Sequence, residues 1–112
     1  MPGAPWRIRD RDSFESLRRS GTRARRGPVT VTYSATGDQR APRVAYAVGR
    51  RVGNAVARNR LRRRLRAVVA EVTGLAPGAY LIGAGPEASE LSYEELKREV
   101  AAAMTHACRG AR

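Results

Sequence analysis

Arginine side chains dominate the middle of the chain. Residues 49–71 contain eight arginines, and no acidic residue occurs between Asp38 and Glu71. A guanidinium group is planar and can donate two parallel hydrogen bonds to one phosphate, so a dense row of arginines is suited to binding a phosphate polymer. A solvated helix face normally mixes both signs of charge, because opposite charges at i and i+4 attract one another. Like charges this close repel, which indicates that a polyanion supplies the missing negative charge.

The same stretch has the period of an amphipathic helix. Asn54 is the predicted N-cap, and the helix is expected to end near Gly74. Arg58 and Arg64 lie beside the apolar edge, where their stems can pack and their charged ends can reach outward. The apolar stripe, at i, i+4, i+7 and i+11, is Leu61, Leu65, Val68 and Val72. We therefore expect one side of this helix to pack on a core and the other to present guanidinium groups.

Groups that could cleave RNA are sparse. Hydrolysis of a phosphodiester needs carboxylates that hold Mg²⁺ or a pair of histidines for acid–base work. The chain has one histidine, His106, and its only group of carboxylates lies in the same C-terminal segment, at Glu94, Glu95 and Glu99. A single cysteine, Cys108, excludes an intramolecular disulfide and a multi-cysteine zinc site. We expect no catalytic residue and no metal site in the protein itself.

Charge is distributed unevenly over the 112 residues, which suffice for one domain with one modest core. Residues 1–66 carry 18 basic and 4 acidic side chains, whereas residues 67–112 carry 4 basic and 6 acidic ones. A basic region of this kind is the pattern expected of a nucleic-acid-binding protein. No apolar run approaches the roughly 18 residues of a membrane span, and the N-terminus lacks the apolar core of a signal peptide. The sequence therefore predicts a cytoplasmic protein.

The elements that must position the arginines follow from periodicity and turn residues. Residues 1–11 are expected to be a flexible basic arm, and residues 13–20 a short helix that ends at Gly21. Strands are predicted at residues 29–33, 43–48 and 79–83, and Ser92 with Glu95 forms a capping box that opens the last helix. The first two of these strands are expected to pair antiparallel, and the strand–helix–strand unit to be a right-handed crossover. The order predicts an α+β domain with helices packed on one sheet.

Residues 43–66 resemble the signature of the protein subunit of bacterial ribonuclease P. The matching features are a strand, the pair Arg50-Arg51, the run Val52-Gly53-Asn54-Ala55-Val56, and the helix that begins with Arg58-Asn59-Arg60. Upstream matches at residues 7–9, 12–14 and 20–21 and the helix after Ser92 extend the resemblance over nearly the whole chain. The resemblance implies one RNA-binding domain over residues 1–112, with αβββαβα order and a four-stranded sheet. It further implies a strand near residues 22–27 and, against the general rule, a left-handed crossover.

By the same resemblance, the partners are the catalytic RNA of ribonuclease P and precursor tRNA, from which the complex removes the 5′ leader. The catalytic groups would belong to the RNA, which requires Mg²⁺, and the protein would bind no cofactor. The positions that match the family's contacts to the catalytic RNA are Arg50, Arg51, Arg58, Asn59, Arg60, Arg62, Arg63 and Arg66. The positions that match its leader-binding cleft are Phe14, Arg18 and Tyr33.

Two of the cleft positions depart from the family pattern. Arg18 stands where many members have a second aromatic residue, so contact with the leader would be more electrostatic here. Tyr33 lies about one residue from a cleft aromatic, and a tyrosine buried in its strand is the alternative interpretation. For Phe14, likewise, packing in the hydrophobic core is the alternative to contact with the leader.

Three other functions fit the sequence less well. A ribosomal-protein-like RNA-binding protein explains the charge but not the spacing of residues 53–66. A DNA-binding helix-turn-helix needs a second short helix just before the basic one, which the pattern lacks. A free-standing nuclease needs the carboxylates or histidines that are missing from the basic region.

Overall fold

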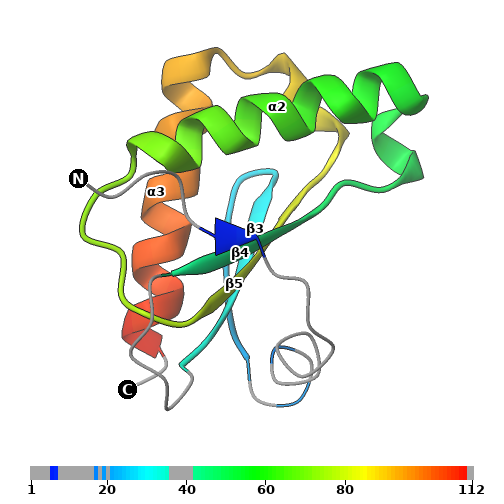
Figure 1. Cartoon of the computed structure of the whole chain (residues 1–112). Helices are drawn as coiled ribbons and strands as arrows, with labels where there is room; N and C mark the ends of the chain where they lie inside the picture. The colour runs from blue at the N-terminus through cyan, green and yellow to red at the C-terminus, as the bar shows by residue number, and fades with distance from the viewer. Residues whose placement is uncertain (1–5, 8–16, 18, 20, 36–41, 111–112) are drawn as a thin grey trace.

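Five strands form one mixed sheet in the computed structural model, which describes residues 6–7, 17, 19, 21–35 and 42–110. The strands are β1 (Trp6–Arg7), β2 (Thr22–Arg26), β3 (Val29–Ser34), β4 (Arg43–Ala47) and β5 (Ala79–Ala84). Their order across the sheet is β1-β4-β5-β3-β2 (Figure 1). β4 is parallel to both of its neighbours, β1 and β5, whereas β3 is antiparallel to β5 and to β2.

Two long helices and two short 3-10 helices complete the described part of the domain. They are η1 (Arg50–Val52), α2 (Ala55–Glu71), η2 (Pro86–Glu90) and α3 (Tyr93–Gly110). The predicted α+β class and the order of β2, β3, β4, α2, β5 and α3 are confirmed, including the strand expected near residues 22–27. β1 adds a two-residue edge strand to the predicted four, within the segment expected to be a flexible arm. The first predicted helix lies mostly outside the described residues, and the left-handed crossover stays a prediction.

The predicted pairing of the strands at 29–33 and 43–48 is wrong. β3 and β4 run in opposite directions, as expected, but β5 lies between them and pairs with both. β5 carries Tyr80 and Ile82, whose side chains are fully buried, and the centre of the sheet is where a strand can bury them. Proximity in sequence is only a tendency, and here burial of the most apolar strand outweighs it.

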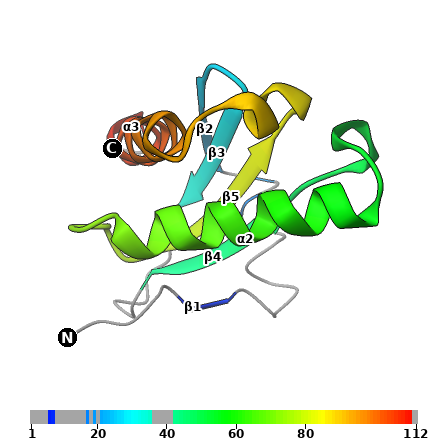
Figure 2. The ribbon, with the colours of Figure 1, turned by 90° about the horizontal axis from the view of Figure 1, so that it is seen from above.

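One face of the sheet packs against both long helices (Figure 2). Alternation along the strands directs Val31, Tyr33, Val44 and Ile82 to this face, where they meet the apolar sides of α2 and α3. The buried residues of α2 are Leu61, Leu65, Val68 and Val69. Val69 therefore replaces the predicted Val72, which lies just beyond the end of the helix and is half-buried.

The opposite face of the sheet carries a smaller cluster of apolar side chains. Leu17 packs there with Ala45 and Ala79, and Leu81 borders them. Gly21 lies so close that a Cβ at this position would come within 2.4 Å of both the Leu17 carbonyl oxygen and Thr32 Cγ2. The predicted helix end at Gly21 thus coincides with a close approach of the chain to the sheet, which only glycine permits.

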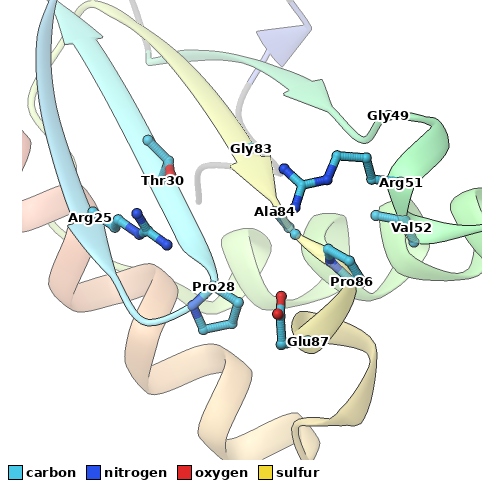
Figure 3. A pocket seen from close by; sticks show the side chains of 11 residues that line it. Arg25, Pro28, Thr30, Gly49, Arg51, Val52, Gly83, Ala84, Pro86 and Glu87 are labelled. Atoms are coloured by element: carbon cyan, nitrogen blue, oxygen red, sulfur yellow. The ribbon is translucent and has the colours of Figure 1, made fainter.

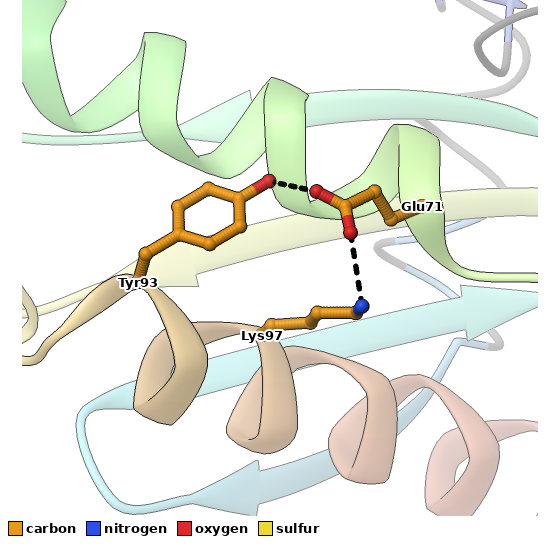
Figure 4. Close-up of polar contacts among 3 residues, drawn as sticks. All are labelled: Glu71, Tyr93 and Lys97. Carbon is orange, nitrogen blue, oxygen red and sulfur yellow. Dashed lines mark hydrogen bonds and ion pairs between the residues drawn. The ribbon is translucent and has the colours of Figure 1, made fainter.

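Polar contacts hold α2 and α3 together at the edge of their shared apolar interface. Glu71, the last residue of α2, accepts a hydrogen bond from the Tyr93 hydroxyl. It also forms an ion pair with Lys97, whose Nζ lies 2.9 Å from a carboxylate oxygen of Glu71 (Figure 4). At the start of α3 the predicted capping box is present: Glu95 N donates to Ser92 Oγ at 3.1 Å, and Ser92 N donates to Glu95 Oε1 at 2.8 Å. The contacts of Glu71 thus join the end of α2 to the first turns of α3, and the capping box fixes where α3 begins.

Candidate nucleic-acid interface

The start of α2 is built by a sharp turn and a side-chain cap. Gly53 has φ +146°, a conformation that L side chains rarely adopt, and it redirects the chain from η1 into the helix. Asn54 Oδ1 then accepts a hydrogen bond from Ala57 N at 2.9 Å, which confirms the predicted N-cap. The helix ends at Glu71, three residues before the predicted Gly74. The turn and the cap together fix where the arginine row begins.

η1 and α2 carry a group of basic side chains outside the apolar core, which we call the arginine surface. It consists of Arg50, Arg58, Arg60, Arg62, Arg63 and Arg66, with Asn59 among them. Arg51, predicted to belong to the same set, instead lines the cavity described below. Most of these side chains are exposed, whereas Arg58 and Arg62 are half-buried. The ion pairs found within the described residues are Lys97–Glu71 and Arg26–Glu99, and neither involves this surface. Its positive charge is therefore not neutralised by the acidic residues of the described part of the chain.

Several members of the arginine surface are held in place by neighbours. Arg62 Nη1 donates a hydrogen bond to Asn59 Oδ1 at 2.6 Å. The exposed side chain of Asn59 therefore orients the guanidinium group of Arg62. The Arg66 guanidinium lies 5.8 Å from the centre of the Tyr46 ring, within the range of a cation–π contact. Burial raises the pKa of Tyr46 to about 12, although the charge of Arg66 opposes the shift. Restraints of this kind reduce the side-chain entropy that would be lost when a phosphate is bound.

Arg64 faces away from this surface, although it lies in the same row of arginines in the sequence. Its Nη2 donates to the Leu91 carbonyl at 2.5 Å, and Nη1 lies 3.5 Å from the carbonyls of Ala88 and Ser89. These carbonyls belong to η2 and to its C-terminal end. Arg64 therefore joins α2 to η2 and has a structural role, consistent with its absence from the predicted RNA contacts.

An exposed valine lies within the arginine surface and was not singled out from the sequence. Val56 keeps 65% of its side chain accessible, more than any other large hydrophobic residue of the described chain. With Asn59, Arg62, Arg63 and Arg66 it lines a shallow groove of about 610 Å³. The groove thus offers apolar contact for a sugar or base beside cationic groups for phosphates. The sequence feature that could have revealed this groove is Val56 itself, an apolar residue in the first turn of the basic helix that lies outside the apolar stripe.

Of the three residues assigned to the leader cleft, Phe14 and Arg18 lie outside the described residues. Tyr33 is 5% exposed, its ring is 4.9 Å from that of Tyr80, and its hydroxyl donates to the Pro77 carbonyl at 2.6 Å. Burial is the main reason that the pKa of Tyr33 is raised. Because a buried ring has no free face on which a base can stack, the cleft assignment of Tyr33 is corrected and its core alternative holds.

Period-two alternation explains this correction. Tyr33 points to the helix-covered face of β3, whereas its neighbours Thr32 and Ser34 point to the opposite face. Adjacent residues of a strand point to opposite faces of the sheet. When the match to the family's cleft aromatic is off by one residue, the tyrosine therefore lies on the other face from the cleft.

At one end of that opposite face lies a cavity of about 410 Å³. Figure 3 shows Arg25 from β2, Arg51 from η1 and Glu87 from η2 around this cavity. Gly83 forms part of the wall and adds no side chain, which leaves the floor of the cavity open along β5. The sequence identified Arg51 as a site residue but not Arg25 or Glu87. Alternation would have placed Arg25 on this face once β2 was paired with β3, since Arg25 lies opposite Thr30.

Three of the six acidic side chains in residues 67–112 have structural partners within the described chain. Glu71 and Glu95 are engaged as described above, and Glu99 lies 3.9 Å from Arg26. Within the described residues, no three His, Cys, Asp or Glu side chains come close enough together to hold a metal ion. His106 is exposed on α3. In the same part of the chain, no helix is both long and apolar enough to cross a membrane.

Comparison with known proteins agrees with this geometry. The family model of ribonuclease P matches residues 3–108. The ribonuclease P protein component of Micrococcus luteus is 41% identical over 111 residues, which cover 88% of this chain and 84% of that protein. The corresponding protein of Beutenbergia cavernae is 39% identical over 107 residues, covering 94% and 90% of the two chains.

Solved structures show the same fold at lower sequence identity. The RNase P protein of Thermotoga maritima superposes with a TM-score of 0.77 at 19% identity, covering 89% of this chain and 96% of that one. A mutant RNase P protein of Staphylococcus aureus gives 0.81 at 17% identity, with coverages of 92% and 88%. The ribosomal-protein-like alternative is not favoured by these matches. Together with the uncompensated arginine surface, they show that the chain belongs to the family of ribonuclease P protein components, subunits of the endoribonuclease that matures the 5′ end of tRNA.

Proposed function

We propose that this subunit binds precursor tRNA through its leader while its arginine surface binds the ribonuclease P RNA, and that the RNA carries the catalytic groups and their Mg²⁺. The observation that carries the proposal is the separation of two basic regions. The arginine surface lies on the outward side of α2, whereas Arg25 and Arg51 flank the cavity at the end of the opposite face of the sheet. Two surfaces of this kind allow one protein to contact two RNA strands at once.

The contribution of the protein is electrostatic and steric. Arginines without acidic partners release counterions when they bind phosphates, and they offset the repulsion between RNA segments that must come close. An unpaired strand is suited to a cationic groove, since its phosphates and base edges are both accessible. The protein would thereby lower the Mg²⁺ concentration that the RNA needs for folding and cleavage. No carboxylate occurs between Asp38 and Glu71, the stretch that carries the arginine surface, which supports a catalytic centre made of RNA.

Reconstitution tests the division of labour. Precursor tRNA is incubated at low Mg²⁺ with the protein alone, with a bacterial ribonuclease P RNA alone, and with both. We expect cleavage only in the mixture, and cleavage by RNA alone once Mg²⁺ is raised. Cleavage by the protein alone would contradict the proposal and support a nuclease.

Leader contact is tested with precursors that differ only in the length of the leader. The dissociation constant of the reconstituted complex is expected to fall as the leader is extended, and to be independent of leader length for RNA without protein. Equal affinity for precursor and mature tRNA would contradict leader binding. The cytoplasmic location predicted from the sequence is part of the same proposal, since it places the protein with its RNA partners.

A further inference from the structure

The cavity between β2, η1 and η2 contains a carboxylate that phosphate binding does not explain. Glu87 points into it from η2, while Arg25 and Arg51 approach from two other elements (Figure 3). A site for phosphate alone is expected to lack an acidic group, because a carboxylate repels the ligand. The presence of Glu87 therefore indicates that the ligand of this cavity carries hydrogen-bond donors as well as phosphates.

Glu87 is free to accept such donors. Among the described residues no hydrogen bond or ion pair joins its carboxylate to Arg25, to Arg51 or to any other group, although both arginines line the same cavity. Gly85 makes room for the carboxylate: a Cβ there would lie 3.1 Å from Glu87 Oε1. Arg25 is restrained by a hydrogen bond of 3.3 Å from its Nε to the Gly27 carbonyl in the β2–β3 turn. The carboxylate thus shares the cavity with two arginines, is exposed to solvent, and has both oxygens available.

A cavity of about 410 Å³ falls in the size range of ligand sites and has walls suited to a nucleotide. Pro28, Val52 and Pro86 supply apolar surface for a base, and the arginines supply donors for the neighbouring phosphates. Base edges of unpaired RNA are read by hydrogen bonds on their Watson–Crick side. A carboxylate has two acceptors side by side and therefore selects a base with two adjacent N–H donors.

Guanine is the base with that arrangement, at N1–H and the N2 amino group. Cytosine and adenine place an acceptor nitrogen beside their amino group, and uracil has one N–H between two carbonyls. We propose that this cavity holds one unpaired guanine of the leader, with Glu87 accepting from N1–H and N2–H and with Arg25 and Arg51 binding the adjacent phosphates. The inference rests on the proposed leader contact and adds a base preference to it.

The test uses the complex reconstituted with ribonuclease P RNA and a set of precursors that carry each of the four bases at one leader position at a time. We expect guanine to bind roughly tenfold more tightly than the other bases at one position, the scale of one bidentate contact. Glu87→Gln removes one acceptor and adds a donor, so it should abolish this preference. Glu90→Gln is the matched control, because it removes the same charge from the same 3-10 helix outside the cavity.

Different outcomes separate this inference from the proposed function. If affinity depends on leader length but not on the base, or if Glu90→Gln removes the preference as fully as Glu87→Gln does, the guanine site is wrong and leader binding stands. If affinity does not depend on the leader at all, both fail. Arg25→Ala provides a further check, since it should weaken binding of all four bases by a similar factor while leaving guanine preferred.

Discussion

Neighbouring arginines on α2 have different roles, because their side chains point in different directions. Arg63 is exposed and lines the groove of the arginine surface, whereas Arg64 is half-buried and hydrogen-bonded to the carbonyls that end η2. The two residues are adjacent in the chain and carry the same charge. They therefore form a matched pair in which the net charge changes equally and only the environment differs.

The pair predicts opposite effects on binding and on stability. Arg63→Ala should weaken binding to the ribonuclease P RNA and reduce the slope of log Kobs against log salt by about 0.7 for one lost phosphate contact. Its free energy of unfolding should change by no more than about 0.5 kcal/mol. Arg64→Ala should instead lower the free energy of unfolding by about 1.5 kcal/mol, because the charged hydrogen bond to the part-buried Leu91 carbonyl is lost.

Urea denaturation and salt-dependent RNA binding measure the two quantities separately. Arg109→Ala, in the last turn of α3, is the control for loss of one positive charge far from α2. A salt slope that is unchanged in Arg63→Ala would show that Arg63 does not neutralise a phosphate. A stable Arg64→Ala variant with impaired RNA binding would move Arg64 onto the interface.

At the scale of secondary structure, α2 is positioned from both ends. Asn54 caps its N-terminus, and Glu71 at its C-terminus is bound by Tyr93 and Lys97 of α3 (Figure 4). The hydrogen bonds from Tyr93 and then Lys97 hold the pKa of Glu71 below its ordinary value of 4.5. A carboxyl group with a lowered folded-state pKa stabilises the fold above its unfolded pKa, and this contribution is lost as pH falls through the folded value.

Glu71→Gln should therefore lower the thermal midpoint at pH 6 and have no effect at a pH where Glu71 of the parent protein is protonated. Tyr93→Phe removes only the hydroxyl and should give a smaller change of the same sign. Thermal unfolding followed by circular dichroism between pH 2.5 and 7 measures both. Glu90→Gln, at an exposed position of η2, is the control for removal of a carboxylate without these partners. An equal destabilisation by Glu71→Gln at both ends of the pH range would exclude the ionised contact as its cause.

At the scale of the whole molecule, the net charge of +12 opposes folding. Repulsion within the basic half acts on the compact state more than on the expanded chain, because the charges are closer together when folded. A polyanion that binds the folded protein removes part of this repulsion and adds its own binding free energy. The stability of the isolated protein should therefore depend strongly on the anions present.

A short single-stranded RNA at about 100 times its dissociation constant is expected to raise the free energy of unfolding by about 2.7 kcal/mol. The neutral-backbone analogue with the same bases should give a much smaller increase, since it has no phosphates. Thermal unfolding at low ionic strength, with each oligomer in turn, makes the comparison. Equal stabilisation by the two oligomers would mean that the bases, and not the charges, dominate binding.

Local patterns in the sequence were sufficient for most of the elements and for the arginine surface. The cap at Asn54, the capping box of Ser92 and Glu95, and the apolar periods of α2 and α3 depend on residues within a few positions of one another. A helix with a 3.6-residue period must present one side outward when the other is apolar, so the exposure of Arg60, Arg63 and Arg66 followed from spacing alone.

Only the tertiary structure decided the order of the strands, the side of the sheet on which Tyr33 lies, and the contents of the cavity. β5 enters between β3 and β4 because the centre of the sheet buries its apolar residues best, a competition among segments far apart in sequence. The cavity gathers Arg25, Arg51 and Glu87 from three elements that no local pattern connects. Short-range periodicity determines which residues share a face of one element, whereas packing between distant elements determines which faces meet.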